Sequence, residues 1–286
     1  MTSRLRSIAI IALTLGATAV AGGALAADQD VTLRFAAKSG AAPLACGRAY
    51  GGVGTTKAGL SLQDFRLYVS AVRLIDDKGR EVPLKMADDG TWQGGGVALL
   101  DFEDASGNCN GNAATNTVVK GTVPAGRYRG LAFDLGVPTA LNHQDPTMAA
   151  PPLNVSALSW PWRAGYKHTT IDIDTSSAGK PDAAGFSIHI GATDCGEGPM
   201  RAPPSSPCRT QNRPTYRFER FDAARQTIVF DLSALLADTD ITVNMPKTPA
   251  GCMSGPGDND CVGVMRRIGL PFRDQPAKPQ AWVRVE

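Results

Sequence analysis

The sequence predicts an all-β protein, a single β-sandwich or distorted barrel with long loops held by disulfides. Short segments that alternate apolar and polar residues, as a half-buried strand does, recur along the chain. Glycine and proline, at 31 and 20 residues, separate these segments with turns. Helical periodicity is weak, and only Ser233–Ala237, just after Asp231, indicates a short helix. The pattern therefore favours a sheet protein over a helical one.

The order of the elements follows from this alternation. The longest strand is expected over 65–75, and the turn residues Asp76–Gly79 lead back into 81–85, which indicates a hairpin. The segment 39–57 is rich in small residues and is expected to be an ordered loop. The full set of expected strands is 31–36, 65–75, 81–85, 97–103, 117–123, 128–137, 166–174, 185–190, 215–221, 226–232, 241–244 and 281–285.

The first 26 residues have the three parts of a secretory signal peptide. Arg4 and Arg6 precede an apolar run, and small residues follow it up to Ala26, after which we expect cleavage. No later segment has roughly 18 uninterrupted apolar residues, and no cysteine stands where a lipoprotein signal needs one. We therefore expect one exported domain, 27–286, in the periplasm and without a membrane anchor.

The charge balance argues against a nucleic-acid partner. The chain has 29 basic and 27 acidic residues, and loss of Arg4 and Arg6 with the signal peptide would leave equal numbers of each. No basic stripe or charge block is present. Affinity for nucleic acid comes mainly from phosphate neutralisation, so this class of partner is not expected.

The six cysteines predict three disulfides, because the count is even and the chain is expected to be exported. Many connectivities are open, and local spacing favours Cys46–Cys109, Cys195–Cys208 and Cys252–Cys261. The segment 196–214 is then a surface loop pinned by its cysteines. A thiolate metal site is the alternative, but no pair has the Cys-x-x-Cys spacing.

All three histidines lie between positions 143 and 189, close in sequence to a Trp-Pro-Trp segment. They are His143, His168 and His189, and the indoles are Trp160 and Trp162. Neutral imidazole is a common ligand of copper, zinc and iron, so the clustering suggests a metal site. The alternative is ordinary packing, since tryptophan often fills a sandwich core and a strand histidine often faces solvent.

Several strings along the chain resemble the MbnP family, exported copper-binding proteins that are also described as the four-Cys proteins of a metallo-mystery pair. They occur in the same order over nearly the whole mature chain. These strings are Leu99-Leu100-Asp101-Phe102-Glu103-Asp104, Gly136-Val137-Pro138, Leu141-Asn142-His143-Gln144-Asp145-Pro146, Ala150-Pro151-Pro152-Leu153-Asn154, Trp160-x-Trp162-x-x-Gly165-Tyr166-Lys167, Phe186-x-x-His189-x-Gly191-x-x-x-Cys195 and Gly251-Cys252-Met253-Ser254.

The resemblance implies a periplasmic copper carrier or store, not an enzyme. Family members are similar in having a di-haem, MauG-like partner, MbnH, which oxidises a tryptophan to kynurenine; copper is then bound by histidines and the kynurenine. Carried onto this chain, His143 and His189 would be ligands, and Trp160 or Trp162 would be converted. His168 stands where the resemblance leads us to expect an aromatic or apolar residue, so it is not supported as a ligand.

Other donors near these motifs are weaker candidates. Met253 and Met265 offer thioethers, although scattered methionine more often serves packing. Asn142 or Asp145 is a candidate for orienting a histidine by hydrogen bonding.

Two other functions remain open from the sequence. One is a mononuclear copper or zinc enzyme using the same histidines, although the chain has no His-x-x-x-His pair and no Gly-x-Ser-x-Gly motif. The other is an extracellular adhesion or glycan-binding module, in which Trp160 and Trp162 form a stacking platform with exposed rings.

Overall fold

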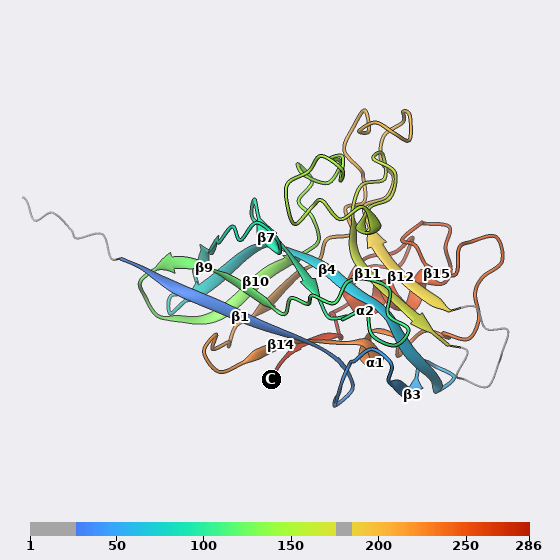
Figure 1. The fold of residues 1–286 in the computed structure, drawn as a ribbon, viewed down its shortest axis with the longest axis horizontal. Helices are drawn as coiled ribbons and strands as arrows, with labels where there is room; N and C mark the ends of the chain where they lie inside the picture. Colours follow the sequence, from blue (N-terminus) through green and yellow to red (C-terminus); the bar gives the residue numbers. More distant parts are fainter. Residues whose placement is uncertain (1–26, 176–184) are drawn as a thin grey trace, which may run out of the picture.

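A computed structural model describes residues 27–175 and 185–286. The expected signal peptide, residues 1–26, lies outside the described residues. The all-β class is confirmed: the described chain forms two mixed sheets packed face to face, with few and short helices (Figure 1). Among these residues, no helix is long and apolar enough to cross a membrane.

The smaller sheet has six strands in the order β16-β14-β1-β9-β6, with β2 paired to β1. Its strands are β1 (Asp28–Ser39), β2 (Ala42–Pro43), β6 (Lys85–Met86), β9 (Val118–Pro124), β14 (Thr227–Asp231) and β16 (Val283–Val285). The pair β1–β14 is parallel and the other pairs are antiparallel.

The larger sheet has ten strands, six of them in the order β13-β10-β4-β11-β12-β15. Its strands are β3 (Ala49–Val53), β4 (Ala58–Asp76), β5 (Glu81–Pro83), β7 (Gln93–Gly94), β8 (Val97–Asp101), β10 (Tyr128–Leu135), β11 (Lys167–Asp174), β12 (Phe186–Gly191), β13 (Thr215–Phe218) and β15 (Gly251–Cys252). The 19-residue β4 pairs with β3, β5, β8, β10 and β11. The predicted hairpin from β4 into β5 is confirmed.

Aromatic side chains from both sheets meet in the core between them. Phe35 of β1 lies 5.8 Å from Phe133 of β10 and 6.1 Å from Phe230 of β14, measured between ring centroids. Trp282 is 1% exposed and donates from Nε1 to the hydroxyl of Tyr216 at 2.8 Å. A large indole therefore fills the core because its one polar atom has a buried partner.

Two expectations for the C-terminal part were wrong. Residues 241–244 form no strand, because Asp240 accepts hydrogen bonds from the backbone N–H and hydroxyl of Thr242 and holds a turn. An amphipathic helix was missed: α2 (Cys261–Ile268) ends at Gly269, whose φ is 92°. The short helix expected after Asp231 is present as α1 (Leu232–Leu235), with Asp231 accepting from the Ala234 N–H.

The six cysteines form the pairs that local spacing suggested. Disulfides join Cys46 to Cys109, Cys195 to Cys208 and Cys252 to Cys261. The last of these ties β15 to the start of α2.

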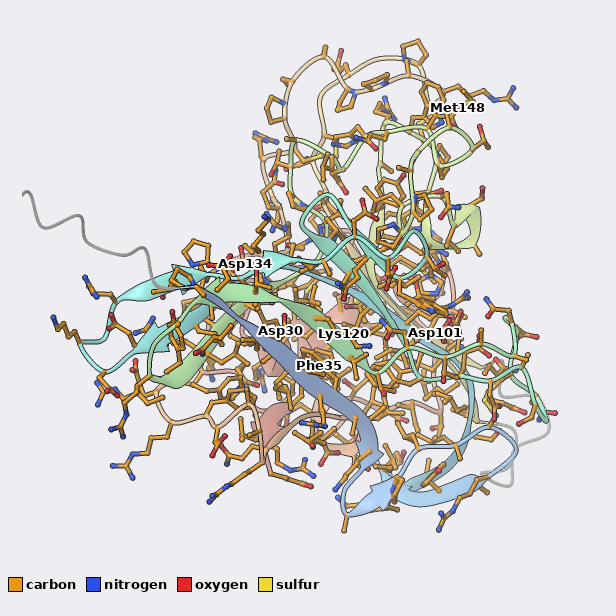
Figure 2. All side chains as sticks on the ribbon, turned by 60° about the vertical axis from the view of Figure 1, so that its left-hand side comes forward. Asp30, Phe35, Asp101, Lys120, Asp134 and Met148 are labelled. Carbon is orange, nitrogen blue, oxygen red and sulfur yellow. A yellow bond between two sulfur atoms is a disulfide. The ribbon has the colours of Figure 1, made fainter. Side chains whose placement is uncertain are left out.

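Two long loops stand together beyond the ends of the sheets, at the top of Figure 1. One contains residues 136–166, with the exposed Met148 near its tip in Figure 2, and the other contains residues 192–214. The guanidinium of Arg163 donates to the Gly198 carbonyl at 2.9 Å, and Thr139 hydrogen-bonds to Gln211 at 2.8 Å. These contacts join the two loops into one layer, which carries most of the candidate site.

Candidate functional site

His143 lies in the first loop against the disulfide of the second. Its Nδ1 is 2.8 Å from the carbonyl oxygen of Trp162. A carbonyl only accepts, so Nδ1 carries the proton and Nε2 keeps its lone pair. Nε2 lies 3.4 Å from the side-chain amide of Asn142 and 3.3 Å from the sulfur of Cys208. His143 is therefore held at one ring nitrogen and has a lone pair at the other.

His189 projects from β12 on the face opposite the core. Ile188 and Ile190, on either side of it, are fully buried, whereas the His189 side chain is 12% exposed. Its Nε2 lies 2.9 Å from the Asp172 carboxylate on β11, and the Nδ1 atom has no hydrogen bond within the described residues. Burial opposes ionisation of Asp172, but hydrogen bonds from His189 and Ser187 outweigh it and lower the pKa of that carboxyl.

His168 occupies a closed structural position. Its Nδ1 accepts from the Val137 N–H at 3.2 Å, and its Nε2 donates to the Gln211 carbonyl at 3.1 Å. A Cβ added to Gly136 would lie 2.5 Å from the ring. Burial lowers the pKa of His168 to about 3, with a smaller contribution from Arg213. Both ring nitrogens are thus used by the backbone, and the imidazole stays neutral.

Trp160 packs directly onto β12. A Cβ added to Gly191 would lie 2.4 Å from Cζ3 of the Trp160 indole, so only glycine leaves room for this ring. Gly191 follows His189 by two residues, and side chains two apart on a strand share a face. The Trp160 ring therefore lies against the position of β12 that shares a face with His189, two residues along the strand.

A hollow of about 440 Å³ opens beside Trp160. Its walls come from the two long loops and from residues on both sides of β15. Its lining residues are Trp160, Arg163, Ala164, Ala192, Thr193, Asp194, Cys195, Met200, Pro249 and Met253. Two thioethers and an indole thus border one space, whereas Met265 is fully buried in the core.

Trp162 differs from Trp160 in its surroundings. It is partly buried, its carbonyl oxygen is the partner of His143, and it does not line the hollow. Asp145, the other residue considered for orienting His143, instead accepts from the backbone N–H and hydroxyl of Thr147 in its own turn.

Ionisable residues form a buried layer beside His189. Across the strands, Asp101 pairs with Arg66, Arg66 with Thr170, and Thr170 with His189. Asp64 accepts from Arg66, yet burial still raises the pKa of Asp64 to about 6 and that of Asp101 to about 7. Acidic side chains therefore outnumber basic ones in this layer, on the strands β4 and β8.

Within the described residues, only two groups of three His, Cys, Asp or Glu side chains bring their ligand atoms within 4.8 Å of one another. One contains His143 with Cys195 and Cys208, and the other contains Glu103 with Cys46 and Cys109. Each group includes both sulfurs of a disulfide, and a disulfide sulfur lacks the thiolate charge that binds metal. Within residues 27–175 and 185–286, no hydrogen bond joins the rings of His143 and His189.

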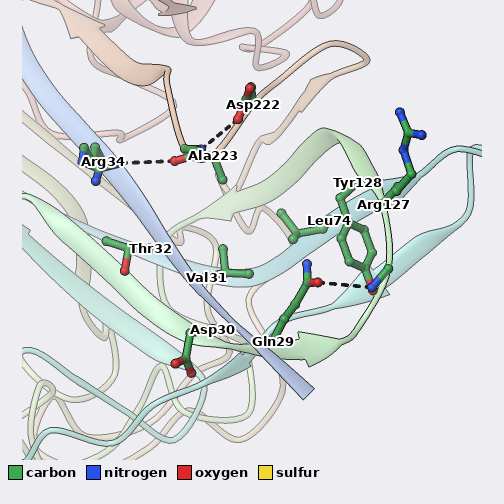
Figure 3. A pocket seen from close by; sticks show the side chains of 12 residues that line it. Gln29, Asp30, Val31, Thr32, Arg34, Leu74, Arg127, Tyr128, Asp222 and Ala223 are labelled. Carbon is green, nitrogen blue, oxygen red and sulfur yellow. Dashed lines mark hydrogen bonds between the residues drawn. The ribbon is translucent and has the colours of Figure 1, made fainter. Parts of the chain in front are cut away.

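A second hollow, shown in Figure 3, lies around the start of β1 and the turn between β9 and β10. Two of its polar groups are engaged with neighbours: Arg34 donates to the Ala223 carbonyl at 3.2 Å, and the Gly126 N–H donates to Gln29 at 3.2 Å. It contains no histidine, cysteine or methionine, so its chemistry differs from that of the Trp160 hollow.

Some residues of the candidate site were not found from the sequence. Asp172 is the main one, although the alternation of β11 places it on the same face as Thr170, which is opposite His189. The contact between His143 and the Cys195–Cys208 disulfide joins residues far apart in the sequence, and no local pattern indicates it.

The comparisons with known proteins agree with this fold. The MbnP family model matches residues 28–254. A solved structure, MbnP from Methylosinus trichosporium, is similar with a TM-score of 0.79 and 33% sequence identity over 91% of this chain and 98% of that chain. A search of curated proteins gave no match. The chain therefore belongs to the MbnP family.

Proposed function

We propose that this protein is a periplasmic copper carrier or store, not an enzyme, and that its copper site needs a kynurenine made from Trp160. The observation that carries the proposal is the contact of the Trp160 ring with Gly191, beside His189. On its other side, Trp160 lines the hollow with Cys195, whose sulfur lies within 4.8 Å of His143. Trp160 thus lies against the strand that carries His189 and borders the same hollow as the disulfide that lies against His143.

The chemistry explains why the tryptophan must change. An indole N–H is a donor without a lone pair for a metal. Oxidative cleavage of the ring between C2 and C3 incorporates two oxygen atoms and gives an N-formyl amide and a ketone. Hydrolysis of that amide by water then releases C2 as formate and leaves an aniline nitrogen beside the ketone. Those atoms can join His143 and His189 as ligands. The oxidant would be delivered by a di-haem partner of the MbnH type, as the family membership suggests.

Imidazole nitrogen and thioether sulfur suit copper, Cu(I) especially. Met253 and Met200 border the same hollow as Trp160 and are candidate additional donors, whereas Met265 is in the core. A glycan-binding platform needs exposed indoles, but Trp160 and Trp162 are both partly buried. A copper site is therefore favoured over that alternative.

The test compares four variants co-expressed with the di-haem partner: Trp160→Phe, Trp162→Phe, His143→Ala and His189→Ala. We expect Trp160→Phe to lose both kynurenine and copper, and each histidine variant to keep kynurenine but lose copper. Trp162→Phe should keep both, because His143 is held by the backbone carbonyl of residue 162. Trp92→Phe, a partly buried indole in another cluster, is the control. Copper retained in full by Trp160→Phe would overturn the proposal.

A further inference from the structure

Asp172 contacts His189 across two paired strands. In the ladder between β11 and β12, Thr170 is opposite His189 and Asp172 is opposite Ser187. Asp172 and His189 are therefore diagonal neighbours on one face, a spacing that longer side chains can bridge. The contact is a hydrogen bond of 2.9 Å between Oδ1 and Nε2.

We infer that Asp172 is a positioning residue that fixes the ring of His189 and makes Nδ1 the copper-binding atom. A carboxylate only accepts, so its partner Nε2 carries the proton, and the lone pair of the neutral ring is then at Nδ1. This inference rests on the proposed function, in which His189 is a ligand. Such carboxylate–histidine pairs commonly fix the tautomer and orientation of a metal-binding imidazole.

The backbone of His189 is fixed as firmly as its ring. The Ser254 hydroxyl donates to the His189 carbonyl at 2.9 Å and accepts from the Gly191 N–H at 3.1 Å. On the core side, Ile188 and Ile190 are fully buried. The ring therefore has few orientations available, and Asp172 selects one of them.

The Asp172 carboxylate has other polar neighbours besides His189: a hydrogen bond from Ser187 and the charge of Lys167 also lower the pKa of this carboxyl. Asp64, its partner across the β4–β11 ladder, is engaged by the guanidinium of Arg66. Lys167 donates its hydrogen bond to the Ala157 carbonyl at 3.1 Å, so it acts on Asp172 through its charge, and His189 keeps the hydrogen bond of 2.9 Å.

The two proposed ligands are oriented in opposite senses. The Trp162 carbonyl accepts from Nδ1 of His143, so the lone pair at Nε2 is left for copper. Asp172 accepts from Nε2 of His189, so there the lone pair at Nδ1 is left for copper. Copper should therefore bind Nε2 of His143 and Nδ1 of His189, a difference that nitrogen NMR of each ring can detect.

The first test uses nitrogen NMR of the metal-free, unconverted protein above neutral pH. Wild-type His189 should be a single Nε2–H tautomer. Asp172→Asn should keep it, because the amide oxygen still accepts, whereas Asp172→Ala should give a mixture. Asp134→Asn is the control, since Asp134 lies in the same sheet with a side-chain exposure of 20%, against 26% for Asp172. An Nδ1–H tautomer in the wild type would overturn the inference.

The second test uses protein with the converted tryptophan. Cu(I) should shift the His189 signal at Nδ1 and not at Nε2, and Asp172→Ala should weaken copper binding by about 10-fold to 100-fold. Asp172→Glu should recover part of the loss, and Asp134→Asn should bind as the wild type does. Unchanged affinity in Asp172→Ala contradicts the inference while leaving the copper site intact. Wild-type converted protein that ignores copper contradicts the proposed function instead, and the tautomer measurement still decides the role of Asp172.

Discussion

Replacing Gly191 with alanine tests the contact between Trp160 and β12. The added Cβ would lie 2.4 Å from Cζ3 of the indole and 2.9 Å from the Tyr166 carbonyl oxygen. Carbon atoms in contact normally stay about 3.5 to 4.0 Å apart, so the ring must retreat by roughly 1.1 to 1.6 Å. Gly191 has no positive φ, so its own backbone conformation accepts a side chain, and the cost comes from the clashes with the Trp160 ring and the Tyr166 carbonyl oxygen.

Overpacking of this size costs about 1 to 3 kcal/mol of the free energy of unfolding. It also moves Trp160 away from His189, so we expect Gly191→Ala to lose kynurenine formation, copper retention or both. Urea unfolding measures the stability of Gly191→Ala. Subtracting the fluorescence of a Trp160→Phe variant isolates the emission of Trp160 and reports the environment of its ring. Copper analysis of protein co-expressed with the di-haem partner measures the copper content of the site.

Gly51→Ala is the matched control, because Gly51 is also a strand glycine and an added Cβ there meets nothing within 4 Å. It should change neither stability nor copper content appreciably. If Gly191→Ala were as stable as Gly51→Ala, with unchanged Trp160 fluorescence and full copper, the placement of Trp160 beside His189 would be wrong.

Three further predictions concern the surroundings of the site. Burial raises the pKa of Asp101 from 3.8 to about 7, so the folded wild type binds a proton that the unfolded chain releases and loses stability as pH rises through that window. Asp101→Asn cannot ionise, and urea unfolding at pH 4 and pH 8 should therefore show its stability rising relative to wild type at the higher pH; an equal difference at both would contradict this. His168→Ala should cost about 3 to 5 kcal/mol through a cavity and two lost hydrogen bonds, yet the folded fraction should keep its copper; copper loss there would make His168 a ligand. Replacing Cys195 and Cys208 by serine should weaken copper binding as well as stability, because that disulfide contacts His143 and borders the Trp160 hollow, whereas the same change at Cys46 and Cys109 should lower only stability, by about 2 to 5 kcal/mol. Similar copper loss in both cysteine variants would show that the Cys195–Cys208 disulfide has no special role in copper binding.

Local patterns explain which parts of the fold were predictable. The period-two alternation of β1 and β12 fixes which residues face the core, so these strands could be placed from the sequence. The strand β4 was found only over 65–75, and its residues from Asp64 to Ser70 are buried on both faces and do not alternate. The segment 241–244 looks similar, but one apolar residue, Ile241, anchors a turn that Asp240 holds. The α2 helix was overlooked because its apolar stripe is short and includes Cys261, which also belongs to a disulfide.

In the candidate site, too, local sequence patterns identify individual residues but not their tertiary contacts. The sequence indicates which side chains carry the chemistry, because His143, Trp160 and His189 stand in recognisable strings. It does not indicate their partners, since Asp172 is reached across strands and Cys208 across loops. The choice of Trp160 over Trp162 likewise depends on packing against Gly191, which is a tertiary contact.

The most direct test of the proposed function maps kynurenine by peptide mass spectrometry in protein made with and without the di-haem partner, with copper analysis of the same samples. Conversion replaces one carbon by one oxygen in the net formula, and fragmentation locates that change. We expect conversion at Trp160 only when the partner is present, and copper only in the converted protein. Conversion at Trp162 alone, or equal copper in unconverted protein, would contradict a site that depends on an oxidised Trp160.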